Sequence, residues 1–344
     1  MHIIELSKEE VDTAMKIVAE LASTYTTVEN DEFLLAAPTR AQELPRRLRD
    51  EINRFRLLES GGGLCVVRGF PVDDSKLGKT PAHWNVKPSH SPTIQHDIFF
   101  YLCASLLADP IAWATQQDGY IMHDILPIKG YEFEQLGAGS EVLLTWHTED
   151  AFHPYRTDYL GLMCLRNPDG VETTYASIEE IELDEQTKRI LFEPRFVIRP
   201  DESHLEKNRG QLRKELAASE ELLQRSYEKI ERMNNDPEKI AILFGDPNRP
   251  YMRIDPYFMD DVFEDEETRS AFHTLVTKID ENIKGYALQP GEILFLDNYK
   301  VVHGRMPFKA RFDGTDRWLK RLNIARDMRK SRDSRISAEH RVIF

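Results

Sequence analysis

A histidine and a glutamate two residues apart, followed much later by a second histidine, have the types and spacing of a metal site. His147 and Glu149 lie at the end of a strand-like run, and His303 follows a second, buried run. On extended backbone, side chains i and i+2 project from one face, so the imidazole and the carboxylate can bind one ion. Two imidazoles and one carboxylate form a facial triad, which leaves three positions open on an octahedral Fe(II) ion. A bidentate cosubstrate and O2 need those positions.

Two arginines downstream of the second histidine strengthen this interpretation, because a His-x-Glu pair alone often occurs by chance. Arg317 and Arg321 lie in a strand-like run, 316–323, and their spacing of four keeps both on one face of an extended strand. Guanidinium groups bind carboxylates in a bidentate manner. One arginine would suit a carboxylate of 2-oxoglutarate, and the other would suit the carboxylate of an amino acid.

The charge balance of the chain argues against nucleic acid and membrane partners. The 344 residues include 45 Lys and Arg against 59 Asp and Glu, a formal net charge of −14 at pH 7. Proteins that bind DNA gain affinity by neutralising phosphates with basic side chains, and anionic membranes attract the same residues. The N-terminus lacks the apolar region of a signal peptide, and no apolar run approaches the roughly 18 residues of a spanning helix. We therefore expect a cytoplasmic protein.

Apolar periodicity predicts helices at the front of the chain and strands after it. Helical spacing covers 8–22 and 41–58, and an apolar run at 97–108 is typical of a buried helix. From about residue 120 onward, short β-branched and aromatic runs alternate with turn signals. Strands in this number without regularly alternating helices indicate a sandwich or jelly roll. The polar, helix-prone stretch 205–240 interrupts them, either as a solvated insertion or as a lid over the site.

Other side chains that could do chemistry fit less well. His83, His90 and His96 lie in a loop without carboxylates at metal-ligand spacing, and His153 lies beyond the turn that follows the His-x-Glu pair. We interpret these histidines as structural or surface residues. The chain has no HExxH motif, no P-loop and no dinucleotide-binding glycine motif opening a helix.

Longer motifs give the chain a family resemblance. These are WHTEDAFHPYRTDY at 146–159, LRNPDG at 165–170, IRPDESHL at 198–205, VHGR at 302–305 and FDGTDRWLKRLNIARD at 312–327. Together they resemble the clavaminate synthase-like 2-oxoglutarate oxygenases. Within that family they are most similar to enzymes that hydroxylate free basic amino acids, which include the arginine 3-hydroxylase of viomycin biosynthesis and bacterial L-lysine 3- and 4-hydroxylases.

This resemblance implies a fold and a cofactor set. It implies a mixed α/β protein with a distorted jelly-roll core, a double-stranded β-helix, flanked by helices. Residues 1–344 would form a single oxygenase domain with 205–240 as a helical, lid-like insertion. Fe(II) would be bound by the triad of His147, Glu149 and His303, and 2-oxoglutarate and O2 would be cosubstrates.

The resemblance also implies roles for individual side chains. Arg317 matches the arginine that binds the distal carboxylate of 2-oxoglutarate, and Thr174, or its neighbour Thr173, matches an assisting threonine. Arg321 matches the arginine that binds the substrate carboxylate, and Gln116 and Glu149 would face the substrate amine. Asp201 and Asp255 match acids that bind the cationic end of the substrate.

Two departures from the arginine enzyme bear on the substrate. That enzyme has a second acid where this chain has Tyr257, and a serine where this chain has Gly137. A guanidinium with five donors favours paired carboxylates, whereas an ammonium is a compact charge with three donors. We therefore expect hydroxylation of a free basic L-amino acid at C3 or C4, with L-lysine favoured and a preference for lysine 4-hydroxylation.

Several alternatives stay open at this point. The substrate could be L-arginine, citrulline or ornithine. Related halogenases lack the carboxylate ligand, so the presence of Glu149 favours hydroxylation over halogenation. A non-catalytic jelly-roll binding protein is the alternative from another class, although retention of the triad and of both arginines argues against it. The sequence also leaves open whether the chain forms a homo-oligomer.

Overall fold

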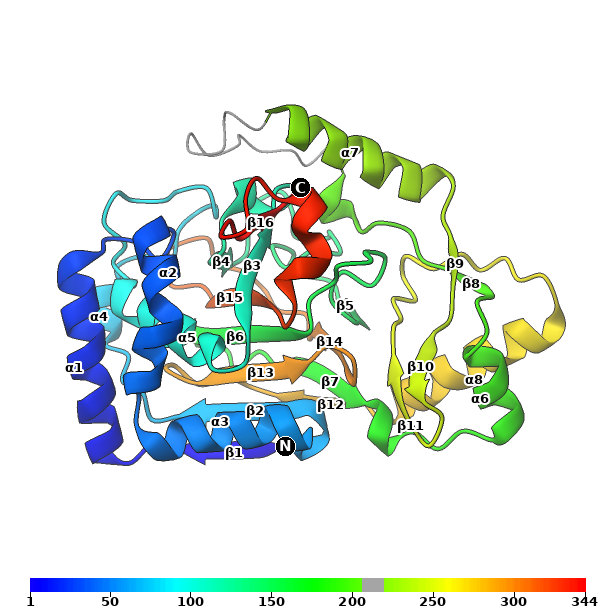
Figure 1. Ribbon diagram of the computed structural model, residues 1–344, viewed down its shortest axis with the longest axis horizontal. Helices are drawn as coiled ribbons and strands as arrows, with labels where there is room; N and C mark the ends of the chain where they lie inside the picture. Colours follow the sequence, from blue (N-terminus) through cyan, green and yellow to red (C-terminus); the bar gives the residue numbers. More distant parts are fainter. Residues whose placement is uncertain (206–219) are drawn as a thin grey trace.

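The computed structural model describes residues 1–205 and 220–344, which form a mixed α/β structure (Figure 1). In this described part, an eight-stranded sheet runs in the order β1-β2-β13-β6-β15-β3-β16, and β4 pairs with β15. Its central strand β6 is buried throughout its length, as expected for a strand covered on both faces. The strands are β1 (His2–Glu5), β2 (Leu64–Arg68), β3 (Asp109–Trp113), β4 (His123–Ile125), β6 (Tyr159–Arg166), β13 (Ile293–Asp297), β15 (Trp318–Ala325) and β16 (Val342–Ile343).

A second sheet of four described strands, in the order β12-β7-β14-β5, carries the two histidines. All of its pairings are antiparallel. Apolar side chains from both sheets form a shared cluster, with Leu160, Leu294 and Leu319 from the first sheet and Val301 and Tyr175 from the second. This layer holds the two sheets together. The strands are β5 (Leu144–His147), β7 (Thr173–Ser177), β12 (Lys284–Tyr286) and β14 (Val301–Arg305).

N-terminal helices cover the outer face of the eight-stranded sheet and belong with it to one hydrophobic cluster (Figure 1). α1 begins with a capping box in which Ser7 and Glu10 satisfy each other's backbone amides, which favours helix initiation there. α5 is apolar on almost every side because it lies between the sheet and the other helices. These helices are α1 (Lys8–Thr24), α2 (Asp31–Arg40), α3 (Arg46–Leu58) and α5 (Ile94–Ser105). The short helix α4 (Asp74–Leu77) instead packs Leu77 into a separate small cluster. The sequence predicted α1, α3 and α5 but not α2.

A second hydrophobic cluster lies beside the four-stranded sheet and includes helices that the sequence did not predict. α6 (Glu185–Leu191) and α8 (Glu266–Glu281) pack there with two short strand pairs. Phe272, Leu275 and Ile279 give α8 helical apolar spacing, but the surrounding strand pattern obscured it. The strand pairs are β8 (Phe196–Val197) with β9 (Lys239–Ile240), and β10 (Leu243–Asp246) with β11 (Arg249–Met252).

The predicted insertion at 205–240 is described only in part, because residues 206–219 lie outside the described residues. Its helix α7 (Glu220–Asn235) packs Leu223 and Tyr227 into the first cluster and Ile230 into the second. α7 is therefore anchored to both halves of the core, which a fully solvated surface insertion would not be. Within the described residues, no helix has the length and apolarity required to cross a membrane.

Candidate active site

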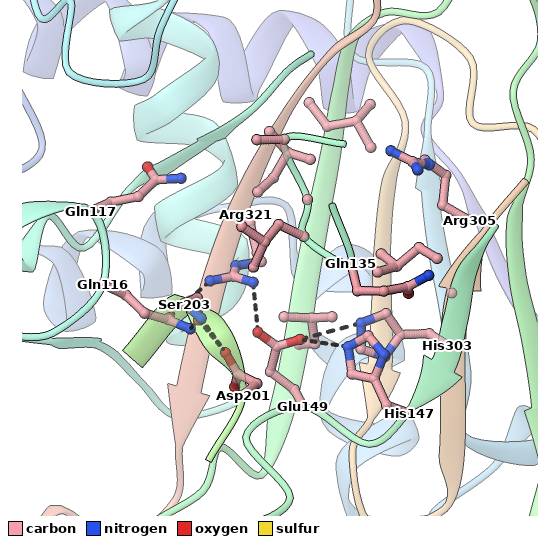
Figure 2. A pocket seen from close by; sticks show the side chains of 18 of the residues that line it. Gln116, Gln117, Gln135, His147, Glu149, Asp201, Ser203, His303, Arg305 and Arg321 are labelled. Carbon is pink, nitrogen blue, oxygen red and sulfur yellow. Dashed lines mark hydrogen bonds and ion pairs between the residues drawn. The ribbon is translucent and has the colours of Figure 1, made fainter. Parts of the chain in front are cut away.

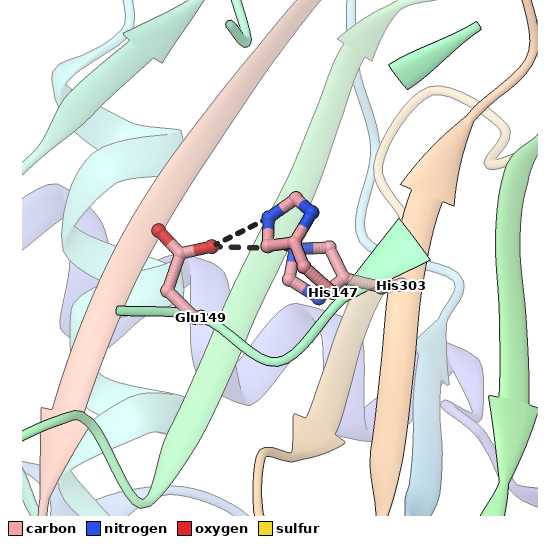
Figure 3. A group of neighbouring side chains, drawn as sticks. All are labelled: His147, Glu149 and His303. Carbon is pink, nitrogen blue, oxygen red and sulfur yellow. Dashed lines mark ion pairs between the residues drawn. The ribbon is translucent and has the colours of Figure 1, made fainter. Parts of the chain in front are cut away.

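The pairing of β5 with β14 brings the two predicted histidines together. His147 and His303 are register partners, and their ring centroids lie 4.6 Å apart (Figure 3). Gly304 makes this approach possible, because a Cβ atom there would lie 2.4 Å from the Leu144 carbonyl oxygen. The sequence placed His303 after a buried strand, whereas it lies within a separate strand, β14, that follows a short turn.

Glu149 completes the group from the turn after β5. Its Oε2 atom lies 3.3 Å from His303 Nε2 and 3.7 Å from His147 Nε2. Asn298 fixes the turn by accepting from the Glu149 amide at 2.7 Å and donating to the Glu149 carbonyl at 3.0 Å. His147 Nδ1 lies 2.8 Å from the Thr145 carbonyl, so it donates there and leaves Nε2, which faces the Glu149 carboxylate, as the atom that can bind a metal. This donor set fits a divalent metal ion.

The electrostatics of the group favour a cation. Burial alone would raise the pKa of Glu149, but Arg321 and the two imidazoles hold it well below its usual range. Burial likewise opposes protonation of His147, yet Glu149 and Asp255 raise its pKa to about 9. A metal ion would take the place of that proton, because a ligating imidazole must be neutral.

A cavity of about 410 Å³ opens beside the triad, within the usual size range of small-ligand sites. Its lining includes nearly all side chains for which the sequence predicted a role: Gln116, His147, Glu149, Asp201, Asp255, Tyr257, His303, Arg317 and Arg321.

Thr174 is the exception, and its neighbour takes its place in the lining. Thr173 pairs with Arg305 in the β7–β14 register, and Thr174 pairs with Gly304. Because side chains alternate along a strand, Thr173 lies on the face of β14 that carries His303, and Thr174 lies on the opposite face. Thr173 accordingly lines the cavity and Thr174 does not.

One end of the cavity contains two buried arginines that have no carboxylate partner among the described residues. Arg317 is 5% exposed, its Nε atom has no hydrogen-bond partner, and burial lowers the pKa of its guanidinium to about 10. Arg305 donates to the Gly139 and Val142 carbonyls, and burial with the nearby Arg317 lowers its pKa to about 9. No carboxylate within the described residues forms an ion pair with either side chain. Since a buried unpaired charge is costly, this end fits an anionic ligand.

Arg321 is held at a different place in the cavity by three neighbours, two of which, Glu149 and Gln116, are labelled in Figure 2. It donates to Glu149 Oε1 at 2.6 Å and to Gln116 Oε1 at 3.0 Å. The His123 Nδ1 atom accepts from Arg321 at 2.8 Å. Gln116 in turn donates to Ser203 Oγ at 2.6 Å. This arrangement presents a guanidinium and an amide to any small ligand beside the triad.

Two acids mark the region that suits a cation. Asp255 is 7% exposed, and burial, with a contribution from nearby Asp201, raises the pKa of its carboxyl to about 6. Asp201 accepts from the Ser203 amide at 2.9 Å and from the Ser203 hydroxyl. Tyr257 is 55% exposed at the cavity rim. Tyr257 is therefore not a core residue. Because its side chain lies at the rim, it does not cover Asp201 and Asp255, which also line the cavity.

Several residues of the site, some in the cavity lining and some behind it, escaped the sequence analysis. His123 and Ser203 lie in runs that otherwise indicate a strand and a turn, and only their tertiary contacts single them out. Arg305 directly follows Gly304 in the VHGR motif, which was the one available signal. His83, interpreted as structural or surface, also lines the cavity.

The family can now be assigned from comparison with known proteins. The model of the taurine catabolism dioxygenase TauD, TfdA family matches residues 38–323. The chain belongs to this family. Its enzyme class is accordingly that of the 2-oxoglutarate-dependent dioxygenases, as the motifs indicated.

Individual relatives cover the whole chain. The enduracididine beta-hydroxylase of Streptomyces hygroscopicus is 51% identical over 345 residues, with 100% of both proteins covered. The L-ornithine/L-arginine 3-hydroxylase of Catenulispora acidiphila is 42% identical, again with 100% of both covered. An L-lysine 4-hydroxylase of Chitinophaga pinensis is 27% identical, covering 90% of this chain and 77% of that protein.

A solved structure has nearly the same fold. The non-heme iron oxygenase OrfP, in complex with Fe, succinate and (3S)-hydroxy-L-Arg, matches with a TM-score of 0.93 and 39% identity, and 100% of both chains is covered. Other OrfP structures contain Fe with alpha-ketoglutaric acid or Fe with L-Arg.

Replacing His303 with alanine tests the triad. We expect His303→Ala to fold normally and to lose affinity for Fe(II) or Co(II) by more than about 100-fold, since even loss of an outer-shell partner costs roughly 10–100-fold. Equilibrium dialysis of the metal measures this, with circular dichroism as the check on folding. His83→Ala is the matched control, because His83 lines the same cavity outside the triad. Equal metal affinity in both variants would remove His303 from the metal site.

Proposed function

We propose that this protein is an Fe(II)- and 2-oxoglutarate-dependent hydroxylase that acts on C3 of a free L-amino acid with a guanidinium side chain. The observation that carries the proposal is the charge layout of the cavity. Arg321 lies beside Glu149, the acids Asp201 and Asp255 face the same space, and Arg317 lies apart from these acids without an anion. A zwitterionic amino acid with a cationic side chain matches the first two features, and a dicarboxylate cosubstrate matches the third.

The substrate preference drawn from the sequence is revised. Tyr257 in place of an acid favoured L-lysine, and especially lysine 4-hydroxylation, over L-arginine. The relatives support the alternative, because proteins named for enduracididine, arginine and ornithine are 42–51% identical to this chain, against 27% for the lysine 4-hydroxylase. Their names also refer to the beta or 3 position, which supports C3. Physically, Tyr257 lies at the exposed rim, so two carboxylates remain for a guanidinium.

The residues of this chain would bind both ligands and orient them. His147, Glu149 and His303 would hold Fe(II), whose chemistry with 2-oxoglutarate is the activation of O2 for hydroxylation of an unactivated carbon. Arg317 and Thr173 would bind the distal carboxylate of 2-oxoglutarate.

The amino acid would be held at both of its ends. Arg321 would bind its carboxylate, and Gln116 together with Glu149 would face its amine. Asp201 and Asp255 would bind the guanidinium, with Tyr257 covering it at the rim. Fixing both ends decides which C–H bond faces the metal, and roughly 1 Å of misplacement can cost about 100-fold in rate.

The same proposal extends to the architecture. We take the two facing sheets as a distorted jelly roll, the double-stranded β-helix of the family, flanked by helices. Residues 1–344 would form one domain. The insertion 205–240 would act as a lid: Asp201, shortly before it, lines the cavity, and its described helix α7 packs on both hydrophobic clusters.

A substrate panel tests the function directly. We expect Fe(II)-dependent succinate release with L-arginine or enduracididine that exceeds release with L-lysine by at least about tenfold, given the charge geometry above. NMR of the product should show the hydroxyl group on C3. Equal or greater turnover of L-lysine would restore the lysine alternative. Absence of turnover with every basic amino acid would favour a non-catalytic binding protein.

Thr173 and Thr174 offer a matched pair for the 2-oxoglutarate site. We expect Thr173→Val to weaken 2-oxoglutarate binding about tenfold, because a hydrogen bond to a charged group contributes roughly 1.5–3 kcal/mol. Thr174→Val makes the same isosteric change on the opposite face of β7 and should leave that affinity unchanged. Anaerobic calorimetric titration of 2-oxoglutarate into each Fe(II) protein provides the measurement. A larger loss in Thr174→Val would reverse our assignment.

Asp255→Asn tests the region that faces the cation. The substitution keeps the shape of the side chain and removes its charge, and truncating one partner of a buried charge pair typically costs about 2–5 kcal/mol. We expect the apparent KM for L-arginine to rise roughly 30-fold or more, with the apparent KM for 2-oxoglutarate nearly unchanged. Parallel increases in both constants would assign Asp255 a structural role instead.

A further inference from the structure

The segment 201–204 is bonded to the metal-site turn through two different routes. The first route runs through the cavity (Figure 2): Ser203 accepts from Gln116, Gln116 accepts from Arg321, and Arg321 donates to Glu149. These polar groups are the ones that the proposed function assigns to the amine and carboxylate of the substrate. A bound amino acid would therefore compete for them, so this route does not fix the segment during the reaction.

The second route is buried and passes through His204. The His204 side chain is fully buried, and its Nε2 atom donates to Asp150 Oδ1 at 3.0 Å. Its Nδ1 atom lies 2.7 Å from Thr115 Oγ1. Asp150 Oδ2 accepts from the Trp113 indole at 2.6 Å. Because Asp150 directly follows Glu149, this route joins the segment to the backbone of a proposed metal ligand.

The surroundings of His204 make the second route rigid. The rings of Trp113 and Phe152 enclose the imidazole, with centroids 5.8 and 5.0 Å away. Asp150 has φ of 50°, a left-handed conformation that non-glycine residues adopt rarely and that surrounding contacts must support. His204 is absent from the cavity lining, and the side chain of Asp150, which is part of the lining, is fully buried. A ligand in the cavity therefore does not replace the imidazole as the partner of Asp150.

Asp201 is attached to the same segment. It caps the short turn Glu202–His204 through the Ser203 amide, at 2.9 Å. A fixed path therefore links Glu149 to Asp201 through the Asp150–His204 bond and this turn. The path spans from the metal and amine side of the cavity to the side that faces the substrate cation.

We propose that His204 is a positioning residue that sets the spacing between Glu149 and Asp201 and thereby decides which carbon of a cationic amino acid lies at the metal. The inference rests on the proposed function and adds a specificity determinant that does not touch the substrate. Adjacent carbons of the substrate chain differ in position by little more than 1 Å along its length, so a small drift of Asp201 is sufficient to change the reacting carbon.

Two polar substitutions of His204 separate the contacts of its Nε2 atom, with Asp150 at 3.0 Å and with Asp201 Oδ2 at 3.8 Å, from simple filling of the space. The amide of His204→Gln reaches as far as Nε2 and retains a donor for Asp150. The shorter His204→Asn reaches only as far as Nδ1 and loses that donor. His204→Leu removes both contacts within an apolar enclosure and serves as a second loss variant. His96→Asn is the control, since His96 bonds the Pro71 carbonyl from α5.

Each variant is assayed as the Fe(II) enzyme with L-arginine and with L-homoarginine, which is one methylene longer. In His204→Asn and His204→Leu, we expect the preference for L-arginine over L-homoarginine to fall on the order of tenfold, and product hydroxylated away from C3 to increase. The affinity for 2-oxoglutarate should stay unchanged. His204→Gln and His96→Asn should behave like the wild type. Anaerobic calorimetric titration of L-arginine into the Fe(II)–2-oxoglutarate complex gives a readout independent of turnover, and affinity should fall in the two loss variants only.

The outcomes distinguish the inference from the function on which it rests. Wild-type turnover of a basic amino acid, combined with unchanged selectivity and product position in a folded loss variant, would overturn the role of His204 alone. Equal losses for L-arginine and 2-oxoglutarate in His204→Asn, without recovery in His204→Gln, would also overturn it, because they indicate general damage. No wild-type turnover with any basic amino acid would overturn the proposed function and this inference together.

Discussion

Glu149 is a buried carboxylate whose two oxygens face different partners. Oε2 faces the two imidazoles at 3.3 and 3.7 Å, and Oε1 accepts from Arg321 at 2.6 Å. A carboxylate with this burial would be strongly destabilised without cationic partners. The rest of the site depends on satisfying it, because the proposed metal ligands and the proposed amino-acid-binding group meet at this one side chain.

The fold supplies the constraints that keep Glu149 in place. The β5–β14 register fixes the imidazoles, and Asn298 forms hydrogen bonds with both backbone groups of Glu149. The residue after Glu149, Asp150, is held by hydrogen bonds from Trp113 and His204. Each constraint comes from a different part of the chain. The carboxylate is therefore preorganised, and a ligand that arrives does not have to order it.

The cavity has a cationic region and a separate acidic region. This separation would direct a dicarboxylate and a guanidinium compound to different places in the same cavity. Arg317 and Arg305 form a cationic region without acids, while Asp201 and Asp255 form an acidic region. A dicarboxylate is repelled from the second region, and a guanidinium is repelled from the first. Sorting by repulsion as well as by attraction is a general basis of specificity.

The sequence by itself determined the metal-ligand types, their spacing and the family. His147 and Glu149 are two positions apart at a strand end, and this local spacing predicted that both side chains could reach one ion, although Glu149 does so from the turn after β5. Long motifs around them gave the family, and apolar periodicity gave α1, α3, α5 and most strands. Spacing, motifs and periodicity are properties of neighbouring residues, so they can be read without knowledge of the fold.

Only the tertiary structure decided the relations that depend on register and on contacts distant in sequence. The choice of Thr173 over Thr174 needed the pairing of β7 with β14, because a shift of one residue reverses the face of a strand. The weight given to Tyr257 is reduced in our proposal, because the sequence does not reveal that its side chain lies exposed at the rim. The link from His204 to Asp150 spans 54 residues, and no local pattern encodes it. Residue types follow from the sequence, whereas their distances and burial arise only when the chain is packed.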